Sequence, residues 1–178
     1  MDRTEVDGEA MTTWGMDNEK MGLTYDQVVL LVIMEAGEVV KERMKVVPDE
    51  LESAEEEKLK RVEIELFYFF MFAIDYWWQH RFGYTREQKS KFAKTFSTHL
   101  NILFGDKAGG RAMWDDLQER FKTYGEIVNA PSSDSVKLWQ FGAKVSEYCD
   151  IESGELILLA QDLFKSARVL VSRFEAEE

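Results

Sequence analysis

Hydrophobic side chains recur every three or four residues along most of this sequence, and that spacing places them on one face of an α-helix. The pattern predicts a first helix from Thr24 to about residue 46, just before Pro48. Three further apolar stripes predict helices over about residues 85–105, 114–128 and 138–149. One more stripe, the most regular of all, predicts a last helix, and its members are Leu156, Leu159, Leu163, Ala167, Leu170 and Phe174.

The second predicted helix, over about residues 53–82, differs from the others because its centre has no polar side. From Leu66 to Trp78 the chain is apolar almost without interruption, so this helix should lie at the centre of the fold. Turns are predicted at Gly83, at Gly109-Gly110 and over residues 129–133. No stretch alternates apolar and polar residues for long enough to predict a β-strand. The predicted fold class is therefore all-α, with about six helices packed as a bundle around the second one.

The same periodicity divides the chain into two parts. Residues 1–22 have no apolar spacing and are rich in Asp, Glu, Thr, Gly and Met, which predicts a flexible acidic N-terminal tail. Residues 23–178 show no break in composition that would separate two domains. A length of 178 residues suffices for one domain with its own core. We therefore predict a single helical domain over residues 23–178.

Charge and composition exclude several classes of function. The chain has 34 acidic and 22 basic side chains, a net charge of −12, and no basic stripe to neutralise phosphates. Direct nucleic-acid binding and binding to anionic membranes are therefore not predicted. The longest apolar run, residues 66–74, is nine residues long, whereas a membrane span needs ~20. The acidic start does not resemble a signal peptide, and the single cysteine, Cys149, cannot form an internal disulfide. These features predict a cytoplasmic protein.

Two carboxylates one helical turn apart are the first candidates for chemistry. Glu35 and Glu38 share one helix face, where their oxygens could hold Mg²⁺ or Mn²⁺. This Glu-x-x-Glu pair resembles one half of the metal site of all-α nucleotide pyrophosphohydrolases, and the resemblance implies a metal-dependent hydrolase. Those enzymes carry a Glu-x-x-Asp pair on the next helix, whereas here Glu65 and Asp75 are ten residues apart, ~15 Å along a helix. The alternative interpretation is a solvated acidic helix face.

Asp75 is a single charge inside the apolar run of the central helix. A buried carboxylate needs partners, or it takes up a proton. One interpretation is a structural hydrogen bond, and the other is a polar anchor in an aromatic pocket with Trp78 beside it. His99, on the apolar face of the next helix, could act as a base oriented by Asp75. Asp75, Trp78 and His99 are therefore the candidate ligand-binding residues, whereas Trp114 and Trp139 are predicted to lie in the core.

No catalytic set of residues is complete in this sequence. Neither His80 nor His99 has a glutamate three residues before it, as a di-iron centre would require, and Asp150 should raise the thiol pKa of Cys149. The sequence favours a non-enzymatic domain that acts through a protein partner or through self-association as a homodimer, with the last helix as contact surface. Two alternatives remain open: the hydrolase, with Mg²⁺ or Mn²⁺ as its cofactor, and an acidic decoy that binds a basic protein.

Overall fold

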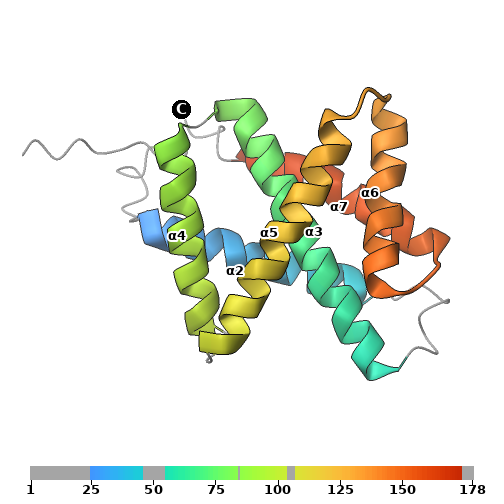
Figure 1. Cartoon of the computed structure of the whole chain (residues 1–178), viewed down its shortest axis with the longest axis horizontal. Helices are drawn as coiled ribbons and strands as arrows, with labels where there is room; N and C mark the ends of the chain where they lie inside the picture. Colours follow the sequence, from blue (N-terminus) through green and yellow to red (C-terminus); the bar gives the residue numbers. More distant parts are fainter. Residues whose placement is uncertain (1–24, 46–54, 84, 104–106, 174–178) are drawn as a thin grey trace, which may run out of the picture.

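The protein is an all-α bundle in the part of the chain that its computed structural model describes, residues 25–45, 55–83, 85–103 and 107–173 (Figure 1). The predicted tail over residues 1–22 lies outside these ranges. The predicted fold class and number of helices are confirmed, because the described ranges contain six helices: α2 (Tyr25–Met44), α3 (Glu56–Phe82), α4 (Arg86–Leu103), α5 (Lys107–Asn129), α6 (Asp134–Cys149) and α7 (Gly154–Arg173).

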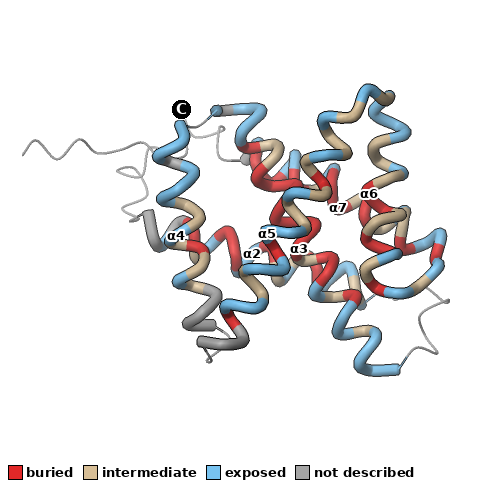
Figure 2. Tube along the Cα trace, in the orientation of Figure 1, coloured by how far each residue is buried: buried red, intermediate tan, exposed pale blue. Residues whose placement is uncertain are grey.

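Helix α3 occupies the centre of the bundle, as its apolar sequence predicts. It packs against α2, α5, α6 and α7, and Figure 1 shows it running diagonally through the molecule, crossed by α5 and by α2. Leu66, Phe69, Phe70 and Ala73 are fully buried, and the buried part of α3 lies in its middle (Figure 2). A helix that contacts neighbours on all sides needs apolar residues on all sides, and this is why residues 66–74 lack a polar face.

The ends of α3 and α6 follow from local backbone chemistry. Gly83 has a φ of +64°, a conformation that glycine adopts without steric cost, and its N–H donates to the carbonyl oxygen of Gln79. The predicted stop at Gly83 is thereby confirmed. At the end of α6, Asp150 takes the left-handed conformation, with a φ of 55°, and its N–H donates to the carbonyl oxygen of Glu147. The chain can therefore reverse directly into α7.

Two predictions of local structure are wrong. Gly109-Gly110 do not form a turn, because α5 begins at Lys107 and includes both glycines. Gly110 is buried, and tertiary packing can outweigh the ~1 kcal/mol helix penalty of a glycine. Trp139 is not a core residue, since 57% of it is exposed. The buried side of α6 contains Phe141, and at about 100° per residue Trp139 points ~160° away from that side chain.

Most of the regular apolar stripe of α7 is buried in the part of the chain that the structure describes, so this stripe is not the exposed contact surface that the sequence predicted. Leu156, Leu163 and Ala167 are fully buried, and α7 packs against α3 and α6. The approach of α6 and α7 is so close that a Cβ atom on Gly142 would lie 2.7 Å from the Cα atom of Ile157. Among the described residues, no helix is long and apolar enough to cross a membrane.

Candidate functional site

Helix α3 carries two buried carboxylates, and they are the only ones among the described residues. Glu65 is 4% exposed and Asp75 is 9% exposed. A charged carboxylate that loses its water shell must gain ionic or hydrogen-bond partners in exchange. The surroundings of these two side chains therefore indicate what each of them can do.

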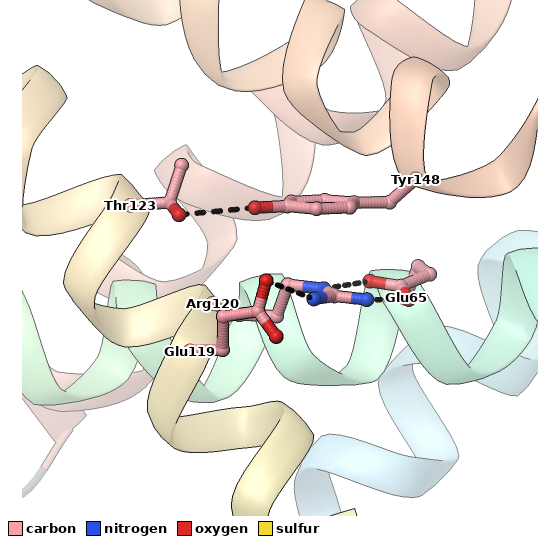
Figure 3. Close-up of polar contacts among 5 residues, drawn as sticks. All are labelled: Glu65, Glu119, Arg120, Thr123 and Tyr148. Carbon is pink, nitrogen blue, oxygen red and sulfur yellow. Dashed lines mark hydrogen bonds and ion pairs between the residues drawn. The ribbon is translucent and has the colours of Figure 1, made fainter.

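Glu65 belongs to a compact ionic cluster that joins α3, α5 and α6 (Figure 3). The Nε and Nη2 atoms of Arg120 each donate to one Glu65 carboxylate oxygen, both at 2.8 Å. The ring of Tyr148 lies flat over the guanidinium, 3.6 Å away, and its hydroxyl donates to the Oγ1 atom of Thr123 at 3.0 Å. Glu119 reaches the same guanidinium at 3.6 Å. Every strong donor of this cluster is directed at an acceptor within the fold, so its role is structural.

The pKa values of this region follow from the same contacts. The hydrogen bonds from Arg120 to Glu65 raise the pKa of the arginine, so it stays charged. Burial, with a smaller contribution from Glu65, raises the pKa of the Cys149 thiol to about 12. The predicted rise is therefore present, but burial rather than Asp150 is its main cause. A thiol with such a pKa is protonated at neutral pH and is a poor nucleophile.

Asp75 has a different setting, because it lines an open cleft of about 740 Å³ between α3, α4 and α5. That volume lies in the range typical of sites for small organic molecules. The cleft wall is largely aromatic, and its ring-bearing residues are Phe72, Tyr76, Phe92, Phe96, Trp114 and Phe121. The polar side chains in the lining include Asp75, Gln79, His80, Lys89, Gln118 and Lys122.

Ring contacts join the helices of the cleft wall at two places. Phe72 of α3 meets Phe121 of α5 edge to face, with ring centroids 5.6 Å apart. Phe96 of α4 meets Trp114 of α5 at 5.9 Å and Phe92 of its own helix at 5.6 Å. Such contacts hold the rings in defined positions. A planar ligand would therefore meet a preformed surface rather than a set of mobile side chains.

The contact between Asp75 and Lys89 in the cleft is long and partly solvated. The Nζ atom of Lys89 lies 3.8 Å from Oδ2 of Asp75, which is longer than a hydrogen bond. The side chain of Lys89 is 53% exposed, whereas that of Asp75 is 11% exposed. The lysine thus reaches in from the solvent toward a carboxylate that is fixed in the wall. A ligand cation could occupy the same position closer to Asp75.

The structure places only one of the three predicted ligand-binding residues in the cleft lining. Trp78 is 1% exposed and belongs to the core, and His99 is half-buried on α4; the described cleft lining contains neither of them. His80 is in the lining instead, with its ring stacked on Tyr76 at 5.9 Å. Tyr76 also lines the cleft. Its place next to Asp75 in the sequence was the signal that could have identified Tyr76 as a lining residue. The binding roles of Trp78 and His99 stay predictions.

Glu35 and Glu38 are exposed on α2. Glu38 forms an ion pair with Lys41 at 3.4 Å on the helix surface. Across the described ranges, no group of three or more His, Cys, Asp or Glu side chains lies close enough together to hold a metal ion. The metal role of this pair stays a prediction from the sequence.

Comparison with known proteins gives no match: no family model, no curated protein and no solved structure is significantly similar to this chain. The chemistry of the cleft must therefore be argued from its own side chains.

Proposed function

We propose that this protein is a helical domain that binds a small organic molecule in the cleft between α3, α4 and α5. The observation that carries the proposal is the position of Asp75, a carboxylate with 9% exposure that opens into an aromatic cleft. Sites for small molecules combine a mostly apolar wall with a few well-placed polar groups, and this cleft has that composition.

The side chains of the cleft favour a ligand with a planar apolar body and a protonated amine. The rings of Phe72, Phe121 and Trp114 supply contact area for the body. Asp75 attracts the ammonium group, and the aromatic faces add cation–π attraction. Lys89 already presents an ammonium group to Asp75 at 3.8 Å, which supports a cationic ligand group at this position. The side chain of Lys89 is 53% exposed, so it can turn into the solvent when a ligand cation takes its place.

Three ligands with the same ring and different charges test the proposal: tryptamine, 3-methylindole and indole-3-acetate. We expect tryptamine to bind most tightly, 3-methylindole at least tenfold more weakly and indole-3-acetate most weakly, as measured by isothermal titration calorimetry. In Asp75→Asn the advantage of tryptamine over 3-methylindole should disappear, because the charge is lost while the size of the side chain is kept. The affinity for 3-methylindole should change less than threefold.

A matched control removes a carboxylate that is not part of the cleft lining. Glu38→Gln changes the net charge by the same amount on the exposed face of α2 and should leave all three affinities within twofold of the wild type. Equal affinities of the wild type for tryptamine and 3-methylindole would refute the role of Asp75. If none of the three ligands binds the wild type, the cleft does not bind rings and the proposal is refuted.

Self-association through α6 is a second candidate function, and the exposure of Trp139 favours it. Trp139 is 57% exposed and Val136, three residues earlier on the same helix face, is 44% exposed. Tryptophan is enriched among the residues that dominate binding energy at protein interfaces. Sedimentation velocity should show a dimer for the wild type and a monomer for Trp139→Ser. Met34→Ser on α2, a 54% exposed apolar residue, is the matched control, and a monomeric wild type would contradict this candidate.

A further inference from the structure

A second pocket lies between α3, α6 and α7, and its lining carries one more cation than that of the cleft. Its volume is about 570 Å³. Tyr76 and Val128 line both cavities, so the two are neighbours. Three lysine or arginine side chains and one carboxylate, Asp134, line the second pocket.

The base of the second pocket is built from aromatic rings in mutual contact. Phe164 of α7 meets Trp77 at 5.3 Å, Tyr76 at 5.5 Å and Phe141 at 5.3 Å between ring centroids. The indole N–H of Trp77 donates to the backbone carbonyl of Phe164 at 3.0 Å, which fixes the ring. The base is therefore a rigid apolar surface suited to a chain or a ring.

The rim of the pocket carries positive charge that the described part of the chain does not neutralise. Lys137, Lys165 and Arg168 line the pocket, and among the described residues none of them forms an ion pair with a carboxylate. The guanidinium of Arg168 instead lies over the ring of Trp77, 5.2 Å from its centroid. Other cations of the described helices, such as Lys60 and Lys144, are paired with glutamates.

This concentration of cations without an ion pair inside the described ranges stands out in a chain with a net charge of −12. With Asp134 counted, the lining carries a net charge of +2, three cations and one anion. Positive side chains beside a low-dielectric apolar wall attract anions more strongly than the same charges in water. The overall charge of the chain is negative, so an anion is attracted here only through this local arrangement of cations.

We propose that the second pocket binds a small carboxylate with an apolar tail, such as a medium-chain fatty acid. The tail lies on the rings of Trp77 and Phe164, and the carboxylate meets the guanidinium of Arg168 at the rim. Arginine suits this role because its planar group can donate two hydrogen bonds to one carboxylate. Lys137 and Lys165 add attraction as point charges. This site is distinct from the amine-binding cleft, and its existence does not depend on the proposed function.

Titration with decanoate, decanol and decylammonium below their micelle concentrations tests the proposal. We expect decanoate to bind the wild type at least tenfold more tightly than decanol. Decylammonium, titrated into Asp75→Asn so that the amine-binding cleft does not contribute, should bind most weakly. Arg168→Gln should weaken decanoate binding at least tenfold and should leave the affinity for decanol within threefold of the wild-type value. Lys60→Gln, which removes a cation at the start of α3, is the matched control. Its affinity for decanoate should stay within twofold of the wild-type value.

Two further variants keep the test independent of any structural role of Arg168. Arg168→Lys retains the charge and should recover part of the loss, and Asp134→Asn removes the one carboxylate of the lining and should strengthen decanoate binding. Circular dichroism melting confirms that each variant is folded. Equal affinities for decanoate and decanol, or an equal loss in Lys60→Gln and Arg168→Gln, would overturn the proposal. Absence of decanoate binding to the wild type would also overturn it.

Discussion

Glu65 and Asp75 lie ten residues apart on α3, both are buried, and their surroundings are opposite. Glu65 receives two hydrogen bonds of 2.8 Å from Arg120, whose side chain is only 11% exposed. Asp75 meets Lys89 at 3.8 Å, and that lysine is 53% exposed. One carboxylate is enclosed by its partners, and the other lies in the wall of a cleft that opens to solvent.

The different surroundings of Glu65 and Asp75 show that burial alone does not distinguish a structural carboxylate from one that can bind a ligand. A buried ion pair with complete hydrogen bonding holds its helices in one arrangement, and breaking it leaves an uncompensated charge. A carboxylate whose ionic partner comes from the solvent side can exchange that partner for a ligand. We therefore assign Glu65 to the fold and propose Asp75 for binding.

The largest expected effect comes from breaking the Glu65 cluster. Glu65→Gln leaves the Arg120 guanidinium buried without its carboxylate and should destabilise the fold by ~3 kcal/mol, the low end of the range for such pairs because Arg120 keeps some exposure. Urea unfolding measures this change. The double variant Glu65→Leu with Arg120→Met removes both charges and should recover most of the loss. If Glu65→Gln unfolds at the same urea concentration as the wild type, the structural role is refuted.

A change in pH should act on the same region. The Cys149 thiol has a pKa raised from 9.0 to about 12 in the folded protein, mainly by burial. Above pH 9 the thiol of the unfolded chain ionises while that of the folded chain does not, so stability falls as the pH rises from 9 to 12. The contribution of this group is at most ~1.4 kcal/mol per pH unit. Urea unfolding of Cys149→Ala should show a shallower loss over that window, and an unchanged slope would contradict the assignment.

A smaller effect is expected from the ring that covers Arg120. Tyr148→Phe keeps the ring over the guanidinium and loses only the hydrogen bond to Thr123, so it should cost ~1 kcal/mol of stability. Tyr148→Leu also loses the cation–π contact and should cost ~1 kcal/mol more. Urea unfolding of the two variants separates these contributions. Identical stabilities of the two variants would mean that the ring does not stabilise the cation.

Much of the fold could be predicted from the sequence because its signals are local. The apolar run over residues 66–74 requires a central helix, and Gly83 supplies the conformation that ends it. The predictions for Gly109-Gly110 and Trp139 failed because tertiary packing decided them. A glycine can lie in the first turn of a helix, and the apolar residues of α6 allow more than one choice of buried side.

The candidate site could be predicted only in part. Asp75 was identifiable because a charge inside an apolar run is unusual, whereas Glu65 follows charged residues such as Arg61 and Glu63 and has no such contrast. Its partner Arg120 is 55 residues away in the chain. The positions of Lys89 and His80 in the cleft depend on how α3, α4 and α5 pack, and no local pattern encodes that register.

The most direct test of the account is thermal unfolding of Asp75→Asn and Glu65→Gln, each with and without tryptamine. Asp75→Asn should melt within ~4 °C of the wild type, a loss of about 1 kcal/mol, because asparagine keeps the size of the side chain and the lost contact with the half-exposed Lys89 is longer than a hydrogen bond. It should also lose most of the stabilisation that tryptamine gives the wild type, ~2.7 kcal/mol at 100 times the dissociation constant. Glu65→Gln should melt much lower and keep that stabilisation. If Asp75→Asn melts as low as Glu65→Gln, or keeps the full response to tryptamine, the distinction between the two carboxylates is wrong.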